Sequence, residues 1–252
     1  LETKGLLMAY QTSHAEKEEA EVVAWARDLG LIIKQLSKQE VQVLQPDVSM
    51  NIEGAYWYES DAHSTPELFM KNLKETLVKK GVTFILNSTV SAFQKKDSRI
   101  NSVVTEKENI TADEFVIASG AWSESLLKSL EINLSVQAGK GYMLNVNKHN
   151  GINLPAILLE AKVAVTPMQG FTRFGGTMEI SGINNKVNSK RVASIAKAAV
   201  DYYPQIIIPQ KSIDEVKYGL RPLSPDGLPF IGRHHKISNL VLATGHSMMG
   251  WS

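Results

Sequence analysis

The sequence contains no cysteine. This absence excludes disulfide bonds, thiolate metal sites and cysteine nucleophiles, although it says little about the compartment in which the protein works. No apolar run approaches the roughly 18 residues that a membrane-spanning helix needs, so we expect no transmembrane segment. The chain does not begin with methionine, and its first residues, Leu1 to Lys4, do not have the pattern of a signal peptide.

An excess of charge of either sign is also absent. The 252 residues hold 27 Lys and Arg against 26 Asp and Glu, a formal net charge of +1. No basic stripe stands out, so the sequence makes no electrostatic case for binding nucleic acid. Internal repeats and low-complexity segments are missing as well. An apolar content of 43% suits a globular core, and the length allows one large domain or two interleaved domains.

Strand and helix patterns of both kinds run through the chain and predict an α+β protein. A helix is expected over 14–29, with Gly30 as its stop, and another over 66–80, where Thr65 can cap and Pro66 suits the first turn. Two shorter helices are expected within 34–44 and 192–203. Strands are expected at 5–10, 54–59, 83–86, 90–95, 100–105, 115–118, 136–146, 157–160, 162–166, 171–174, 213–220 and 240–243.

The stretch from Phe115 to Ser123 predicts a buried strand, a small-residue turn and the start of a helix. Free backbone amides at such a turn bind nucleotide phosphates and flavins. An ordinary strand-to-helix turn of an α/β protein has the same pattern. From the residues alone, both interpretations stay open.

The segment from Tyr218 to Arg233 is rich in glycine and proline. We therefore expect it to form loops and not regular helices or strands. Arg221 lies within this segment. The apolar run at 240–243 then predicts a buried strand that ends in the turn Thr244-Gly245-His246. A glycine in such a turn lets the backbone come close to a ligand.

Taken together, these segments resemble the D-amino acid dehydrogenase and glycine oxidase family of FAD-dependent oxidoreductases, and most closely its bacterial D-amino acid dehydrogenases. The late motifs are Gly-Leu-Arg-Pro at 219–222, Pro-Asp-Gly-Leu-Pro at 225–229, Ile-Gly at 231–232 and Thr-Gly-His to Gly-Trp at 244–251. Earlier similar elements are Ala-Ser-Gly-Ala-Trp at 118–122, Lys-Gly-Tyr at 140–142 and Gly-Gly-Thr-Met-Glu at 175–179. Any one of these motifs alone would be weak evidence, but their combination is specific to the family.

The family begins with a Gly-x-Gly-x-x-Gly fingerprint that places the FAD pyrophosphate on a helix N-terminus, and this sequence lacks it. We therefore expect a fragment whose retention of FAD is in question. The resemblance implies a substrate-binding domain over 1–60 and 126–216, with a mixed, mostly antiparallel sheet. It implies a residual FAD-binding domain over 61–125 and 217–252.

The resemblance implies an enzyme that uses FAD to deaminate a D-amino acid, or a glycine- or sarcosine-like amine, to the imino or keto acid. Electrons would pass to a quinone or to oxygen. Two alternatives stay open: a flavoenzyme of the same fold acting on a 2-hydroxy acid or glycerol 3-phosphate, and a non-catalytic substrate-binding fragment. We expect a cytoplasmic protein, with peripheral contact to the inner membrane left open. No metal is expected, because His234 and His235 lack further ligands at a suitable spacing.

Arg221 is the strongest candidate site residue, because the resemblance implies that the arginine of its motif clamps the substrate carboxylate. The alternative is a structural arginine paired with Asp226 or with carbonyl groups of its loop. His246 and Tyr142 are further candidate substrate contacts, against a structural histidine and a core tyrosine. No general base is assigned, because hydride transfer from a neutral amine to a flavin requires none.

For the cofactor, the resemblance implies contacts from both small-residue turns. The backbone amides from Gly245 to Gly250 are expected along the pyrimidine edge of the flavin, where they would stabilise negative charge. Val90 is expected near the adenine, whereas Thr177 and Glu179 are expected to support the sheet. The expected cofactor-binding residues are Val90, Ala118, Gly120, Trp122, Gly219, Gly245, His246, Met248, Met249, Gly250 and Trp251.

Overall fold

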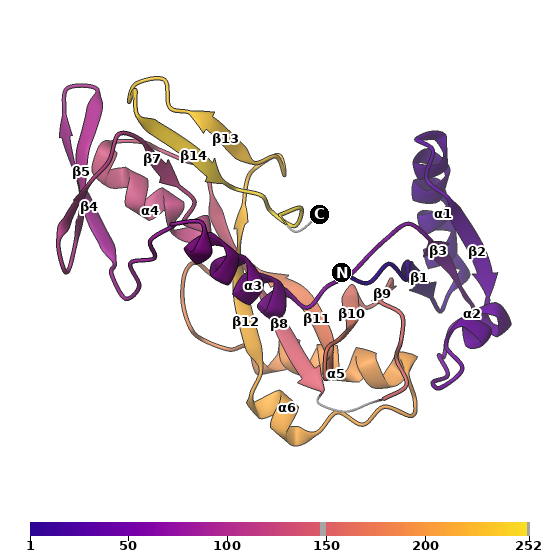
Figure 1. The fold of residues 1–252 in the computed structure, drawn as a ribbon. Coiled ribbons are helices and arrows are strands. Elements are labelled where there is room, and N and C mark those ends of the chain that lie inside the picture. The colour runs from indigo at the N-terminus through magenta and orange to yellow at the C-terminus, as the bar shows by residue number, and fades with distance from the viewer. Residues whose placement is uncertain (147–149, 251–252) are drawn as a thin grey trace. The chain divides into compact units, whose positions relative to one another are not determined.

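The computed structural model describes residues 1–146 and 150–250 of the chain (Figure 1). The chain divides into two compact units, each of which is described by itself. Unit 1 comprises Leu1–Lys79, Tyr142–Thr177 and Val187–Tyr218, and unit 2 comprises Lys80–Gly141, Met178–Lys186 and the chain from Gly219 onward.

The boundary expected near residue 60 falls at Lys79, because helix α3 (Pro66–Lys79) belongs to unit 1, and the one expected near 125 falls at Gly141, whereas the one expected near 216 falls at Tyr218. Two contacts attach the start of this helix to the unit. Arg173 pairs with Glu67 at 2.5 Å, and the Gln169 backbone N–H donates to Thr65 Oγ1 at 3.1 Å. The assignment of one domain to substrate and the other to FAD stays a prediction.

A mixed sheet is the frame of unit 1, and three of its strands continue into unit 2. Its strands lie in the order β12-β8-β11-β10-β9-β1-β3-β2. Strand β1 pairs in parallel with β9 and antiparallel with β3, and the pairs β2–β3, β9–β10 and β10–β11 are antiparallel. The bounds are β1 Leu6–Tyr10, β2 Ile33–Ser37, β3 Gly54–Tyr58, β8 Gln137–Val146, β9 Ala156–Leu158, β10 Val163–Met168, β11 Phe171–Glu179 and β12 Lys217–Leu223. The expected mixed α and β fold class is confirmed.

The remaining helices of unit 1 start at polar caps that the sequence provides. Thr12 accepts from the Ala15 N–H at the start of α1 (Ser13–Asp28), and Ser37 and Glu40 form a capping box on α2 (Lys38–Leu44). Asn188 caps α5 (Ser189–Tyr202). One face of α5 enters the core through residues three and four apart, as the helical period requires: Val192, Ile195, Ala198, Ala199 and Tyr202.

Unit 2 holds two three-stranded sheets around its own core. One sheet has the order β4-β5-β6, with bounds Val90–Lys96, Arg99–Thr105 and Asn109–Thr111. The other has the order β13-β14-β7, with bounds Phe230–Arg233, Leu240–Thr244 and Phe115–Ile117. Buried Asn239 joins the two sheets, because its Oδ1 accepts from the Ile100 N–H and its Nδ2 donates to the Ile100 carbonyl, both at 2.9 Å.

Several sequence expectations were wrong. Residues 83–86 join no sheet, and their apolar side chains are exposed. The strand expected at 213–220 begins only at Lys217, in β12, because 213–214 end helix α6 (Gln210–Asp214). The glycine- and proline-rich segment is not all loop, since it contributes β12 and β13. Pro222 is tolerated in β12 because this strand lies at the edge of its sheet.

Within residues 1–146 and 150–250, no helix has both the length and the apolar character needed to cross a membrane.

Candidate functional site

Two turns that are far apart in the sequence meet in unit 2. Strands β7 and β14 pair in parallel, with Leu240 opposite Phe115 and Leu242 opposite Ile117, and they lie side by side in Figure 1. Both strands therefore end at the same edge of the sheet. The first turn, 118–122, follows β7, and the second, 245–250, follows β14. The carboxyl ends of parallel strands are where α/β sheets bind ligands.

A chain of buried hydroxyl groups fastens the two turns together. Ser123 Oγ donates to Thr244 Oγ1 at 3.0 Å, and Thr244 Oγ1 donates to the Gly120 carbonyl at 3.1 Å. Ser119 Oγ lies 3.1 Å from Ser123 Oγ. Each hydroxyl has one proton, so Ser119 must donate to Ser123 for the chain to be complete. Ser123 is 0% exposed and Thr244 is 1% exposed, so water does not compete for these bonds.

The second turn requires glycine at its first position. Gly245 has φ of +77°, and a Cβ built on it would lie 2.8 Å from the Phe230 ring. Beyond it, the Ser247 N–H donates to the Pro222 carbonyl and the Met249 N–H to the His246 carbonyl. The expectation that all amides from Gly245 to Gly250 face a flavin is therefore too broad. Among described residues, the amides of Gly245, His246, Met248 and Gly250 have no hydrogen-bond acceptor.

The surface next to these amides is suited to an aromatic ring that carries polar edges. Trp122 is 53% exposed, and Met248 and Met249 are 70% and 63% exposed. Around Gly120, which has φ of +56°, no atom lies within 4 Å of the position of a Cβ. Apolar side chains, open glycine backbone and free amides therefore fit a flavin. Trp251 lies outside the described residues.

Arg221 lies in β12, the edge strand of its sheet, and its side chain reaches toward the neighbouring strand β8. Its Nη1 is 2.2 Å from the position that a Cβ on Gly141 would take. The guanidinium is half-buried, and burial lowers the pKa of Arg221. Among described residues it makes no hydrogen bond or ion pair. The alternative pairing with Asp226 is not seen, because Asp226 Oδ1 accepts from the Leu228 N–H instead.

The second turn is also fastened to the strand that bears Arg221. Besides the Ser247 N–H bond to Pro222 at 2.9 Å, the Ser224 N–H donates to Ser247 Oγ at 3.2 Å. Ser247 adopts a left-handed conformation, with φ of +50°. The candidate carboxylate clamp and the candidate flavin turn thus share one hydrogen-bonded frame within unit 2.

The other expected site residues are distributed more widely. Val90 begins β4 in the other sheet of unit 2, and Gly219 is exposed in β12. His246 is half-buried, and its imidazole makes no hydrogen bond to a described residue. Tyr142 is 0% exposed in the core of unit 1, where its hydroxyl accepts from the Asn188 N–H at 3.1 Å. We therefore take the core interpretation of Tyr142.

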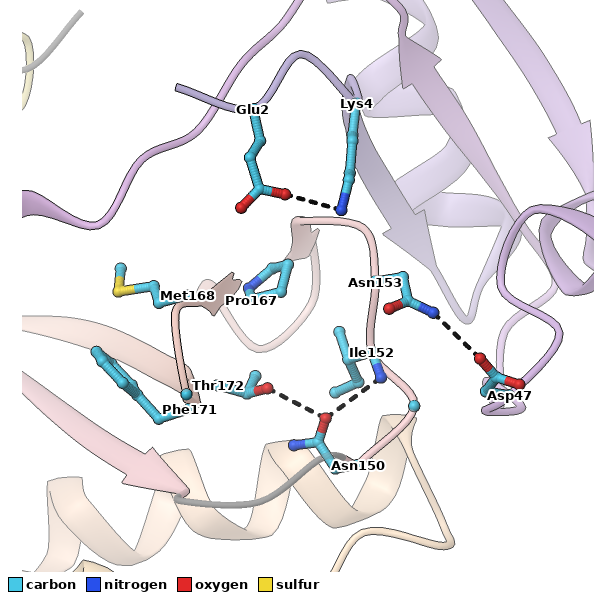
Figure 2. A pocket seen from close by; sticks show the side chains of 12 residues that line it. Glu2, Lys4, Asp47, Asn150, Ile152, Asn153, Pro167, Met168, Phe171 and Thr172 are labelled. Atoms are coloured by element: carbon cyan, nitrogen blue, oxygen red, sulfur yellow. Dashed lines mark hydrogen bonds and ion pairs between the residues drawn. The ribbon is translucent and has the colours of Figure 1, made fainter.

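Two cavities lined by described residues have no expected site residue in their walls. A cavity of about 590 Å³ in unit 1 is shown in Figure 2, where Lys4 pairs with Glu2 and Asn153 donates to Asp47. Its polar side chains thus largely satisfy one another. A second cavity, of about 630 Å³, lies in unit 2 and is lined in part by Leu223, Ser224 and Pro225 at the end of β12.

Comparison with protein families gives a match along the whole chain. The family described as "DAO: FAD dependent oxidoreductase" matches residues 1–252. The chain belongs to this family of FAD-dependent oxidoreductases.

Among relatives in this family is a protein named D-amino acid dehydrogenase from Neisseria meningitidis serogroup C. It is 33% identical over 258 residues, which cover 99% of this chain and 60% of that protein. Glycine oxidase from Bacillus cereus has the same fold, with a TM-score of 0.85 at 24% identity over 99% of this chain and 68% of that one. The FAD-bound L-α-glycerophosphate oxidase of Mycoplasma pneumoniae has a TM-score of 0.82 at 19% identity, covering 99% and 69%.

Sequence reasoning missed the residues that fasten the site. Thr244 and Ser123 are 121 positions apart, and Ser224 and Ser247 are 23 apart. The sequence shows Thr244 as part of a small-residue turn, but no local pattern indicates that it contacts Ser123. Gly141 was visible only as part of a motif, with no indication that it faces Arg221.

Proposed function

We propose that this chain is part of an enzyme that uses FAD to oxidise a D-amino acid to an imino acid, which water hydrolyses to a keto acid and ammonia. The observation that supports this most is the half-buried Arg221 guanidinium, which lacks a partner among the described residues. A buried cation without a counter-charge is costly unless a ligand supplies the charge. The similarity to a relative named D-amino acid dehydrogenase supports the same conclusion.

In this proposal the residues of unit 2 bind and orient. Arg221 would hold the substrate carboxylate with two parallel charge-assisted hydrogen bonds. FAD, when bound, supplies the acceptor for the hydride that leaves the substrate α-carbon. Gly120, Gly245 and the free amides of His246 and Met248 would line the flavin and stabilise negative charge on it. As the hydride leaves a neutral amine, the nitrogen lone pair forms the C=N bond of an iminium ion, which water can deprotonate or hydrolyse, so no side chain need act as a general base.

The proposal extends to the whole protein, because the chain spans 60% of the length of its curated Neisseria relative. The electron acceptor, a quinone or oxygen, and the alternative amine substrates glycine and sarcosine belong to the proposal as well. Peripheral contact with the inner membrane would follow from a quinone acceptor.

Arg221 variants test the proposal in a completed chain, meaning this chain joined to the segments of the Neisseria relative that lie outside the match. Arg221→Ala should raise the KM for D-alanine by about 30- to 1,000-fold, as expected for the loss of a clamp that contributes roughly 2–4 kcal/mol. Arg221→Lys should lie in between, because it keeps the charge and loses the fork.

The control is Arg233→Ala, because this arginine already pairs with Glu114 at the surface and should leave the KM unchanged. An unchanged KM in Arg221→Ala would contradict the clamp. Turnover of 2-hydroxy acids or glycerol 3-phosphate in place of D-amino acids would favour the alternative substrates, since a guanidinium also suits a phosphate or a hydroxy acid.

A further inference from the structure

The Gly139-Lys140-Gly141 stretch of β8 has both glycines on one face and the lysine on the other, because strand side chains alternate. All three residues are buried. The Lys140 side chain is 0% exposed, and its Nζ donates to Asn184 Oδ1 at 2.5 Å and to the Lys186 carbonyl at 2.9 Å. Lys140 therefore holds the 184–186 segment, and the two glycines need a different explanation.

Backbone conformation does not explain them. Neither glycine is among the residues of positive φ, and both lie within a regular strand, which any residue except proline can enter. What distinguishes them is the space in front of each Cα. A Cβ on Gly139 would lie 2.4 Å from Met178 Sδ and 2.7 Å from Leu223 Cδ1. A Cβ on Gly141 would lie 2.2 Å from Arg221 Nη1, 3.1 Å from its Cζ and 3.3 Å from its Nη2.

The guanidinium of Arg221 thus occupies the volume that a side chain at position 141 would fill. No described residue holds it with a hydrogen bond or ion pair, so its position depends on packing, and the bare Gly141 backbone is part of that packing. We infer that Gly141 is a positioning residue for Arg221, and that the absence of its side chain sets where the substrate carboxylate is bound. The inference rests on the proposed function of Arg221.

Alanine at position 141 should push the guanidinium away, because real Cβ atoms do not approach another heavy atom to 2.2 Å and the arginine end is the part that can move. Gly139→Ala is the matched control. It adds the same methyl group to the same face of the same strand, with a similar collision, but it meets Met178 and Leu223 in place of Arg221.

Binding of propanoate, an unreactive carboxylate, is measured by calorimetry in the completed chain, together with the KM and kcat for D-alanine. Gly141→Ala should weaken propanoate and raise the KM by about 10- to 100-fold, as expected for a misplaced binding group, with a smaller change in kcat. Gly139→Ala should stay within about twofold of the parent. In the Arg221→Ala background, Gly141→Ala should add no further loss, because it acts through the guanidinium. A crystal structure of Gly141→Ala should show Nη1 displaced.

The outcomes separate the two proposals. If Arg221→Ala leaves propanoate affinity unchanged, the proposed clamp itself is wrong. If Arg221→Ala weakens propanoate but Gly141→Ala binds it like the parent, or weakens it equally in the Arg221→Ala background, the positioning role is overturned. Should Gly141→Ala alone fail to fold, recovery of folding in the Gly141→Ala/Arg221→Ala double variant would support the contact, and failure of both would refute it.

Discussion

At the scale of single residues, the glycines of this chain do different work. At Gly141 a side chain would collide with the Arg221 guanidinium, and at Gly120 the missing side chain leaves the backbone accessible. Gly245 is needed twice, because its φ is +77° and because a side chain would meet Phe230. Gly227 has nearly the same φ, +80°, but nothing lies within 4 Å of its Cβ position. The two glycines therefore separate the conformational requirement from the packing requirement.

Substituting alanine for Gly227 and for Gly245, both in unit 2, should measure the free-energy cost of the conformational requirement and that of the packing requirement. Gly227→Ala should cost about 1–2 kcal/mol of unfolding free energy, the usual cost of a left-handed conformation for a residue with a Cβ. Gly245→Ala should cost roughly 1–3 kcal/mol more, because the added methyl overpacks against Phe230 at 2.8 Å. Urea denaturation measures both, and equal losses in the two variants would mean that Phe230 moves aside freely.

At the scale of elements, the parallel pairing of β7 and β14 brings the two turns together, and hydrogen bonds between hydroxyl groups hold them to each other. Thr244 ends β14, and Ser123 begins helix α4 (Ser123–Leu127). The bond between them is buried, and the Gly120 carbonyl accepts from both the Thr244 hydroxyl and the Ser123 backbone N–H. The geometry of the two turns thus depends on contacts between β14 and α4 and not on either element by itself.

A double-mutant cycle on this pair should show coupling. Thr244→Val keeps the shape but leaves the buried Ser123 hydroxyl proton without an acceptor and removes one of the two donors to the Gly120 carbonyl, which should cost about 1–3 kcal/mol. Ser123→Ala should also destabilise. The double variant should lose less than the sum, by roughly 0.5–2 kcal/mol, because an orphaned group has been removed with its partner. Additive losses in thermal or urea unfolding would contradict a direct, energetically significant bond.

At the scale of the whole molecule, the expected site residues gather in unit 2, which has a core of its own. Arg221 and every described residue expected to bind the cofactor lie in unit 2, whereas Tyr142 lies in unit 1. The glycine-rich fingerprint that would hold the pyrophosphate is absent from these 252 residues. In the proposed function, the residues of unit 2 would therefore contact the flavin ring without the fingerprint that holds the pyrophosphate of the dinucleotide.

Binding of FAD to this chain by itself should consequently be weak. We expect the visible flavin bands to be lost on desalting, because the glycine-rich fingerprint that would place the pyrophosphate on a helix N-terminus is absent from these 252 residues. With FAD in excess, hydrogen exchange should slow at 118–123 and 244–250. ADP is the control, because it lacks the isoalloxazine ring and should not protect these turns. Protection found only in unit 1, or equally with ADP, would contradict the proposed flavin contacts.

The sequence by itself determined the element types over most of the chain, the mixed fold class and the membership in a family of FAD-dependent oxidoreductases. Periodicity, caps and turn residues are local signals, and motifs such as Gly-Leu-Arg-Pro at 219–222 are read directly. Only the tertiary structure decided that residues 83–86 stay outside any sheet, that α3 belongs to unit 1, and that Thr244 meets Ser123. It alone placed the Arg221 guanidinium over Gly141. The physical reason is that strand pairing, burial and hydrogen bonds between distant residues depend on the neighbours that folding supplies.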